Sequence, residues 1–201
     1  MPLTTEDLFF QSAGLDRSRV QGLIDQALEG GDDGELFLEY RQSESFSFDD
    51  GRLKAATFDT SQGFGLRTVA GEMTGYAHSN ELSEAAIKRA GDSIAAVKKG
   101  YGGTMSVAPA RTNRQLYVPG NPLEGVPFAV KVKLLQDIDA YARAKDARVR
   151  QVSASLAGTW QAVEIIRAGG ERASDLRPLV RLSVSVVAGA GDRQETGSYS
   201  S

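Results

Sequence analysis

The sequence predicts an α+β fold in which two runs of antiparallel strands are separated by helices. Apolar residues recur at helical spacing over residues 16–30, 83–98 and 127–145, whereas a period of two marks the segments 35–78 and 149–199. Turn signals divide these two segments into short strands. Because strands come in runs with helices between them, the order favours a largely antiparallel sheet.

Two helices are expected at the start of the chain. Thr4 can cap the first helix, with Asp7 answering at the third position, and Asp16 is the expected N-cap of the second. The apolar residues of the second helix fall on one face, and they are Val20, Leu23, Ile24, Ala27 and Leu28.

Residues 35–78 are predicted to form an antiparallel four-strand meander. The first strand carries apolar residues at even positions from Leu36 to Phe48, and the turn signal Asp50-Gly51 follows it. The remaining three strands are expected at residues 53–58, 63–69 and 73–77, with Ala70-Gly71-Glu72 as the last turn.

Two covering helices are expected on either side of a long loop. The first helix, from about Ser83 to Lys98, has an apolar stripe of Ile87, Ala90, Ile94 and Val97. Residues 100–126 are rich in proline and glycine, so they form a surface crossing or an ordered loop and mark a possible subdivision. The second helix, about Pro127 to Lys145, is expected to present one apolar side of Val130, Leu134, Ile138, Tyr141 and Ala142.

A second run of antiparallel strands is predicted after residue 148. Strand-like segments occupy residues 149–156, 160–167, 179–187 and 193–199. In the third of these, valine and leucine alternate with arginine and serine, which is typical of a strand with one solvated face.

Composition limits the classes of partner. The net charge of −3 and the pI of about 5.3 leave no excess of cations to neutralise phosphates, so we expect no direct binding to nucleic acid. Cysteine is absent, which fits a reducing compartment. The first residues do not resemble a signal peptide and no stretch has the length of a membrane span, so we expect no membrane contact and a cytoplasmic location.

No catalytic or metal-ligating residue is predicted in this chain. His78 is the single histidine, and zinc catalysis needs three protein ligands and an open position. We therefore interpret His78 as an ordinary residue near a strand end. The same histidine would have to serve a Ser-His-Asp arrangement, for which no Gly-x-Ser-x-Gly elbow is present.

Two segments carry candidate binding residues. The glycines of Gln62-Gly63-Phe64-Gly65-Leu66-Arg67 lead into a strand, which favours a close backbone approach or a bulge over a phosphate loop. In Arg177-Pro178-Leu179-Val180-Arg181, the proline and the arginines can blunt a sheet edge. Alternatively, an arginine beside an open edge can hold a peptide carboxylate while the edge pairs with the peptide backbone.

Four stretches of the chain resemble the TldD/PmbA family, and the TldD branch in particular. They are residues 61–67 (SQGFGLR), 71–77 (GEMTGYA), 152–156 (VSASL) and, above all, 175–186 (DLRPLVRLSVSV). This family was named for a proposed role in modulating DNA gyrase, and its members are regarded as zinc metallopeptidases. The resemblance implies a parent protein that cleaves peptides with a zinc-activated water, in a dimer of two related subunits.

The resemblance covers only the N-terminal half of the family. Family members continue into a C-terminal metal-binding domain with a His-Glu-x-x-x-His motif, and no such motif occurs in residues 1–201. We therefore interpret the chain as an N-terminal, non-catalytic part of its parent protein. We expect the parent to bind zinc, this part to need no cofactor, and this part to help form a chamber that admits peptide.

The residues expected to contact a peptide are Gln62, Gly63, Gly65, Arg67 and Arg181. One alternative is a non-enzymatic protein-interaction module directed toward the gyrase system. Another is a small-molecule enzyme with Arg67 or Arg181 as an anion clamp, which is disfavoured because no general base stands out.

Overall fold

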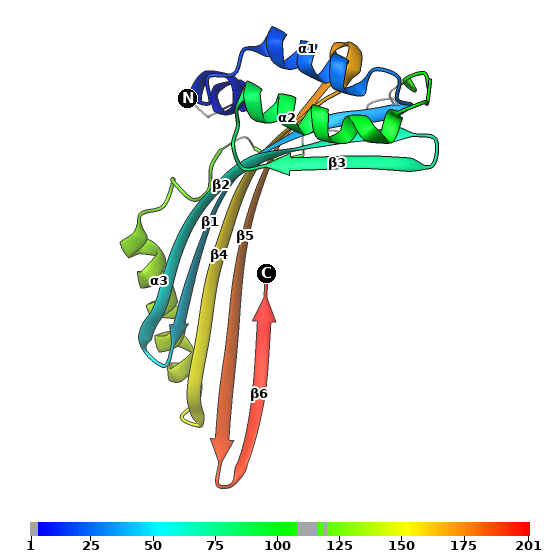
Figure 1. Ribbon diagram of the computed structural model, residues 1–201. Helices are drawn as coiled ribbons and strands as arrows, with labels where there is room; N and C mark the ends of the chain where they lie inside the picture. Colours follow the sequence, from blue (N-terminus) through cyan, green and yellow to red (C-terminus); the bar gives the residue numbers. More distant parts are fainter. Residues whose placement is uncertain (1–3, 108–115, 119) are drawn as a thin grey trace. The chain divides into compact units, whose positions relative to one another are not determined.

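A computed structural model describes residues 4–107, 116–118 and 120–201 of the chain. Its helices and strands form a mixed α+β architecture with one six-stranded antiparallel sheet in the order β3-β2-β1-β4-β5-β6 (Figure 1). The predicted fold class is therefore confirmed. The elements in chain order are η1 Asp7–Ser12, α1 Arg17–Leu28, β1 Asp33–Asp49, β2 Arg52–Ala70, β3 Met73–Ser79, α2 Glu84–Ile94, η2 Ala95–Lys98, α3 Phe128–Lys145, β4 Val149–Ile166, η3 Ala168–Gly170, β5 Arg172–Ala190 and β6 Arg193–Ser200.

The strands are fewer and longer than the sequence predicts. Residues 35–78 form three strands because β2 runs without interruption through the polar segment 59–62, where a break is expected. In the same way, β4 continues through residues 157–159. In the strand order, β2 lies between β1 and β3, and β4 lies between β1 and β5, so each of these long strands has a neighbour on both sides and local polarity does not interrupt it.

The chain divides into two compact units, and β1, β2, β4 and β5 each contribute residues to both. The first unit comprises Met1–Arg41, Ser61–Pro119 and Gln161–Leu176, and the second comprises Gln42–Thr60, Gly120–Trp160 and Arg177–Ser201. No helix in the described ranges is long and apolar enough to cross a membrane.

In the first unit, α1 and α2 pack against each other on one face of the strands (Figure 1). Asp16 caps α1 as predicted, since it accepts a hydrogen bond from the Arg19 amide at 2.8 Å. Ser83, the expected start of α2, caps that helix by accepting one from the Ala86 amide at 3.1 Å. The expected Thr4–Asp7 hydrogen bonds also form, before a π-helical turn. The buried core includes Val20, Ile24, Leu28, Leu36, Leu38, Leu66, Ile87 and Ile94.

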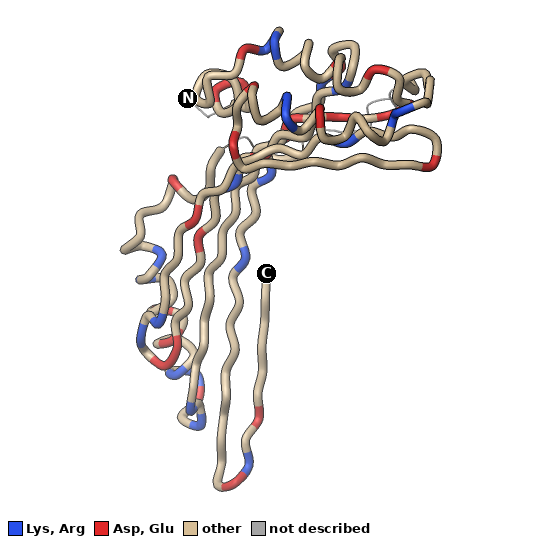
Figure 2. Tube along the Cα trace, in the orientation of Figure 1, with Lys and Arg blue, Asp and Glu red and all other residues tan. Residues whose placement is uncertain are grey.

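In the second unit, α3 packs on a core formed by Phe46, Phe48, Leu135, Ala154 and Leu156. The helix lies where the sequence predicts it, and Pro127 stands at its N-cap. In β6, the final strand, the charged residues lie near the hairpin with β5 (Figure 2).

The predicted inward side of α3 is wrong in part. The residues of α3 that are buried are Lys131, Leu135 and Asp139, whereas Val130, Leu134 and Tyr141 are between 44% and 65% exposed. Ile138, from the predicted stripe, does pack against the core. Lys131 can lie on the buried face because its amino group bonds both carboxylate oxygens of Glu44 on β1, at 2.6 and 2.7 Å.

Candidate functional site

A hollow of about 290 Å³ lies on the open face of the sheet in the first unit. It crosses β1, β2 and β3, and it lies opposite the face that α1 and α2 cover, because the buried β2 residue Leu66 points toward α2, where a Cβ at Gly91 would lie 4.0 Å from its side chain. The residues around it are Phe37, Glu39, Arg41, Ser61, Gln62, Gly63, Phe64, Gly65, Tyr76, His78, Ser79 and Asn80.

Two glycines of β2 line this hollow, and both have close neighbours on or beside β3. A Cβ at Gly65 would lie 2.7 Å from the Tyr76 hydroxyl, and a Cβ at Gly63 would lie 2.7 Å from the Ser79 carbonyl oxygen. Both distances are shorter than a van der Waals contact. The close backbone approach that the sequence suggests for this Gly-x-Gly is therefore present at Gly63, whereas the neighbour of Gly65 is the Tyr76 side chain, and the glycines lead into no helix.

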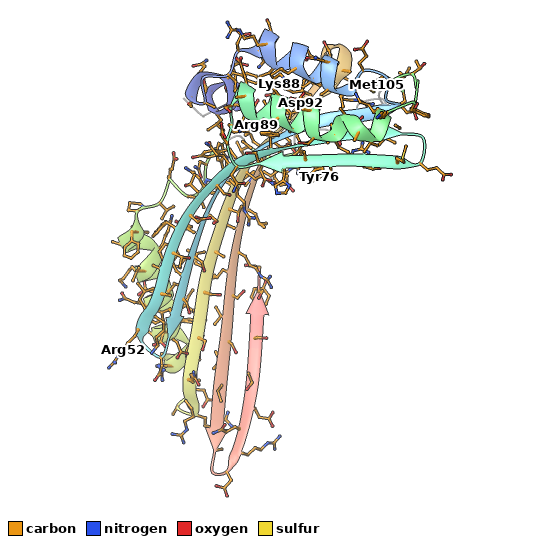
Figure 3. All side chains as sticks on the ribbon, viewed as in Figure 1. Arg52, Tyr76, Lys88, Arg89, Asp92 and Met105 are labelled. Atoms are coloured by element: carbon orange, nitrogen blue, oxygen red, sulfur yellow. The ribbon has the colours of Figure 1, made fainter. Side chains whose placement is uncertain are left out.

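An aromatic pair on β3 forms one wall. The antiparallel register places His78 opposite Gly65 and Tyr76 opposite Arg67. The Tyr76 and His78 rings stack with centroids 5.8 Å apart and an angle of 27°. Tyr76 lies on the side of β3 away from α2 (Figure 3), and 64% of its surface is exposed. This wall offers a flat, partly apolar surface to a ligand.

The opposite wall comes from β1 and is charged. Glu39 accepts a hydrogen bond from the Gln161 amide at 2.8 Å, and Arg41 is exposed. With the Gln62 and Asn80 amides, the hollow presents hydrogen-bond donors and acceptors of both charges. Such a lining suits the amides and side chains of a peptide better than a phosphate-rich ligand.

The donor set does not fit a catalytic zinc ion. His78 is the single histidine of the chain and cysteine is absent. Within the ranges that the structure describes, no group of three His, Cys, Asp or Glu residues could hold a metal ion. A zinc site requires three protein ligands with one open position, so no catalytic step through zinc can be derived for these residues.

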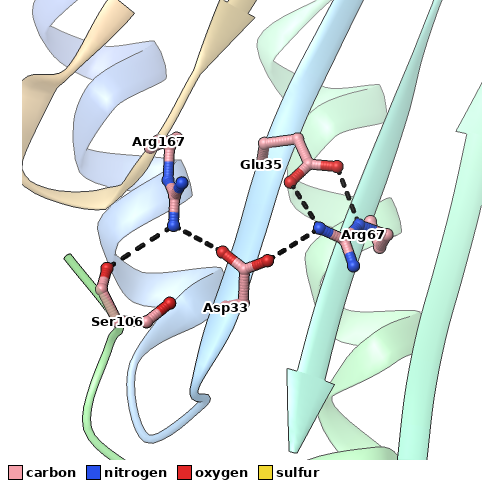
Figure 4. Close-up of polar contacts among 5 residues, drawn as sticks. All are labelled: Asp33, Glu35, Arg67, Ser106 and Arg167. Atoms are coloured by element: carbon pink, nitrogen blue, oxygen red, sulfur yellow. Dashed lines mark hydrogen bonds and ion pairs between the residues drawn. The ribbon is translucent and has the colours of Figure 1, made fainter. Parts of the chain in front are cut away.

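Arg67 lies on β2 next to the hollow but takes part in an ion cluster (Figure 4). Its guanidinium donates hydrogen bonds to both carboxylate oxygens of Glu35, at 2.7 and 2.8 Å, and to one carboxylate oxygen of Asp33, at 2.9 Å. The hydrogen bond to Glu35 raises the pKa of Arg67 well above its usual value, partial burial opposes this, and Asp33 adds to the rise. Arg167 also bonds Asp33, and its guanidinium lies 3.5 Å from the Ser106 carbonyl oxygen.

Arg181 belongs to the second unit. It is exposed on β5. The next residue, Leu182, exchanges two backbone hydrogen bonds of 3.0 Å with Ser201, and these bonds lie at the end of the pairing between β5 and β6. Of the five residues expected to contact a peptide, the structure brings Gln62, Gly63 and Gly65 together in the hollow. A substrate role for any of the five stays a prediction.

The sequence does not predict that Glu39, Arg41 and Tyr76 contribute to the hollow, and it gives His78 no function. One signal was present: a two-residue turn at Gly71-Glu72 fixes the register that places His78 beside Gly65. The contribution of β1 could not be found in this way, because the pairing of β1 with β2 passes through a long, locally polar segment.

Comparison with known proteins identifies the family. Residues 34–98 match the family model described as PmbA/TldA metallopeptidase domain 1, and residues 121–201 match its central domain. The chain belongs to the TldD/PmbA family. The gap between these two matches, residues 99–120, overlaps the loop at which the sequence suggests a subdivision, and residues 108–115 and 119 of that loop lie outside the described residues.

Relatives within the TldD/PmbA family are named as metalloproteases. The chain is 34% identical, over 85% of its length, to a Metalloprotease TldD homolog of Haemophilus influenzae, and it covers 36% of that protein. It is 30% identical, over 98% of its length, to a Metalloprotease TldD homolog of Buchnera aphidicola subsp. Schizaphis graminum, and it covers 41% of that one. The chain thus spans about two fifths of these relatives.

Solved structures share the fold. A protein of Thermotoga maritima, described as a proposed modulator of a DNA gyrase, aligns with 95% of the chain at a TM-score of 0.69 and 18% identity, over 42% of its own chain. A similarly described protein of Bacteroides thetaiotaomicron aligns with 92% at 0.66 and 17%, over 44% of its chain. TldE from Thermococcus kodakarensis aligns with 90% at 0.60 and 13%, over 42%.

Proposed function

We propose that this chain is the N-terminal, non-catalytic part of a TldD-like zinc metallopeptidase that degrades or processes peptides. The observation that carries the proposal is the match to two consecutive domains of the PmbA/TldA metallopeptidases. The similarity to relatives named as TldD metalloproteases supports it as well. On this proposal, the zinc ligands and the catalytic groups belong to a C-terminal metal-binding domain outside residues 1–201.

The contribution of this chain is to bind and admit substrate as part of a chamber. The hollow around Gly63 and Gly65 supports this role, since it combines a stacked aromatic wall with charged and amide groups. We further propose that a homologous TldD/PmbA-type subunit completes the assembly as a dimer. The absence of cysteine supports a cytoplasmic, reducing environment for that assembly.

The test uses the longest natural form of the protein and an unfolded, fluorescently labelled peptide. Cleavage that a chelator abolishes and added zinc restores is the expected result. Intact peptide after prolonged incubation of the zinc-loaded form, alone and with its homologous subunit, would reject the peptidase assignment. A downstream gene region without a His-Glu-x-x-x-His motif would reject it as well.

A second candidate is a non-enzymatic protein-interaction module. The exposed apolar residues Val130, Leu134 and Tyr141 on α3 favour it, because solvent-facing apolar side chains on one helix commonly mark contact surfaces. Two structural neighbours described as proposed gyrase modulators suggest one direction for the search. Co-purification with a partner, without zinc-dependent cleavage by the longest natural form, would favour this candidate over the peptidase.

A further inference from the structure

The outer edge of β3 ends the sheet in the first unit. In the strand order, β3 has β2 on one side and no further strand of the described chain on the other (Figure 1). The strand extends from Met73 to Ser79, and all seven residues pair with β2 in a continuous antiparallel register. The opposite side of β3 therefore presents a straight row of backbone groups.

The register shows which residues carry the outward backbone groups. Ala70 and Met73 flank the two-residue turn, so they form a hydrogen-bonded pair, and such pairs alternate with non-bonded ones along the hairpin. Thr74, Tyr76 and His78 fall in the non-bonded positions. Their N–H and C=O groups therefore point away from β2 and are oriented to pair with another strand.

Within residues 73–79, this edge strand lacks the charges, proline and bulges that protect many sheet edges from pairing. Natural edge strands carry lysine, proline, inward charges or bulges. The sequence of β3 has no Asp, Glu, Lys, Arg or Pro, and its unbroken register leaves no bulge. β6, at the other end of the sheet, carries Arg193 and Glu195, whereas β3 has no Lys, Arg, Asp or Glu along its length (Figure 2).

The two faces of β3 differ in the side chains that they would accept beside them. On the open face, Tyr76 and His78 stack and favour aromatic or β-branched neighbours at alternate positions. On the helix-covered face, Gly75 has no side chain, and a Cβ there would lie 3.0 Å from Val97 and 3.1 Å from Ile94. A strand beside β3 thus meets an aromatic surface on one face and a close-packed apolar surface on the other.

We propose that the edge of β3 binds an extended, uncharged peptide segment as an additional strand of the sheet. The proposal rests on the proposed peptidase function, for which this edge would hold unfolded substrate next to the hollow. Backbone hydrogen bonds to Thr74, Tyr76 and His78 supply affinity that is independent of peptide sequence. The aromatic pair adds a preference for β-branched or aromatic side chains at every second position.

Hydrogen exchange of individual amides is the direct test. The probe is a soluble, uncharged octapeptide that alternates Val and Thr, added to the 201-residue chain. Exchange at Thr74, Tyr76 and His78 should slow by about tenfold or more at saturating peptide. The amides of Gly75 and Ala77 point toward β2 and should change little. Unchanged exchange at the three outward amides, or protection confined to β6, would overturn the proposal.

Two changes remove hydrogen bonds between the β3 edge and the peptide: a substitution in β3 and a modification of the peptide. Thr74→Pro deletes an outward N–H at an edge position where proline is tolerated, and Thr74→Ala is its matched control. The proline variant should bind the peptide about fivefold or more weakly, whereas the alanine variant should bind as the parent does. An octapeptide N-methylated at alternate residues should lose binding to the unaltered chain, which keeps the test decisive if the proline variant does not fold.

The outcomes separate this inference from the proposed function. Cleavage by the longest natural form that is unaffected by Thr74→Pro, together with no peptide protection at β3, would leave the peptidase assignment standing and reject the docking edge. Protection of the three amides that grows with protein concentration in the absence of peptide would show that a second copy covers the edge, which also rejects it. Peptide binding at β3 without any cleavage would support the edge and reject the peptidase.

Discussion

The buried ion pair between Lys131 on α3 and Glu44 on β1 provides a quantitative test of the packing in the second unit. The lysine amino group lies 2.6 and 2.7 Å from the two carboxylate oxygens and also donates to the Leu123 carbonyl oxygen at 2.8 Å. The two side chains are only 7% and 5% exposed. Lys131→Met keeps most of the aliphatic volume but leaves the Glu44 carboxylate buried without its cation.

The expected cost follows from that burial. Removing one partner of a buried ion pair costs about 3–5 kcal/mol, because the remaining charge cannot regain its hydration. For a chain of this size, about 2–4 °C of melting temperature is lost per kcal/mol, so we expect a decrease of roughly 6–20 °C. The double variant Glu44→Leu, Lys131→Met should recover most of the loss, since an apolar pair of similar volume is often neutral or stabilising.

Urea and thermal unfolding, followed by the fluorescence of Trp160, measure this effect. Trp160 is the single tryptophan, is 1% exposed and belongs to the second unit. The matched control is Lys133→Met on the same helix, where the ion pair with Asp137 is 65% and 59% exposed and is worth less than about 1 kcal/mol. Equal losses for Lys131→Met and Lys133→Met would refute the burial argument.

Three further predictions follow from individual contacts. Gly63→Ala should lower the free energy of unfolding by about 1–3 kcal/mol, because the added Cβ meets a backbone oxygen. Gly65→Ala should lower it by less than about 1 kcal/mol, because the added Cβ meets a tyrosine ring that can move. A urea titration that shows the reverse order would contradict the packing described. Arg67→Met should lower the free energy of unfolding by about 1–2 kcal/mol, a small value because the Arg67 side chain is 36% exposed. The same urea titration in high salt should show a smaller loss, because salt screens the ion pairs. No loss at low salt would mean that the ion cluster does not form. The pKa of Asp146 is lowered to about 2, chiefly by the side chain of Arg148, so this carboxylate stabilises the fold above about pH 4 and the effect is lost as the pH falls toward 2. Arg148→Ala should raise that pKa toward its ordinary value in a carbon-detected NMR titration, and an unchanged midpoint would exclude the assigned cause.

Local signals in the sequence predict the beginnings of helices well. Asp16 and Ser83 each cap a helix through an amide only three residues away, so the sequence contains both partners of the interaction. The turn at Gly71-Glu72 is equally local and fixes the β2–β3 register. These features depend on short-range chemistry and could be predicted without any knowledge of the fold.

Interactions between distant segments explain what the sequence could not predict. The buried face of α3 includes Lys131, whose partner Glu44 is 87 residues away in the sequence. An apolar pattern alone assigns such a lysine to the solvent side. Likewise, Arg67 meets Glu35 only after β1 and β2 have paired, so its place in an ion cluster is invisible in the sequence. The five candidate binding residues stay predictions for the same reason: their chemistry depends on neighbours that the fold supplies.

Metal content and peptide hydrolysis, measured for the 201-residue chain alongside the longest natural form, test where the catalytic groups lie. We expect no stoichiometric zinc and no chelator-sensitive cleavage for the 201-residue chain, and about one zinc per chain with chelator-sensitive cleavage for the longer form. Chelator-sensitive hydrolysis by residues 1–201 alone would contradict the central claim that the catalytic groups lie elsewhere in the protein.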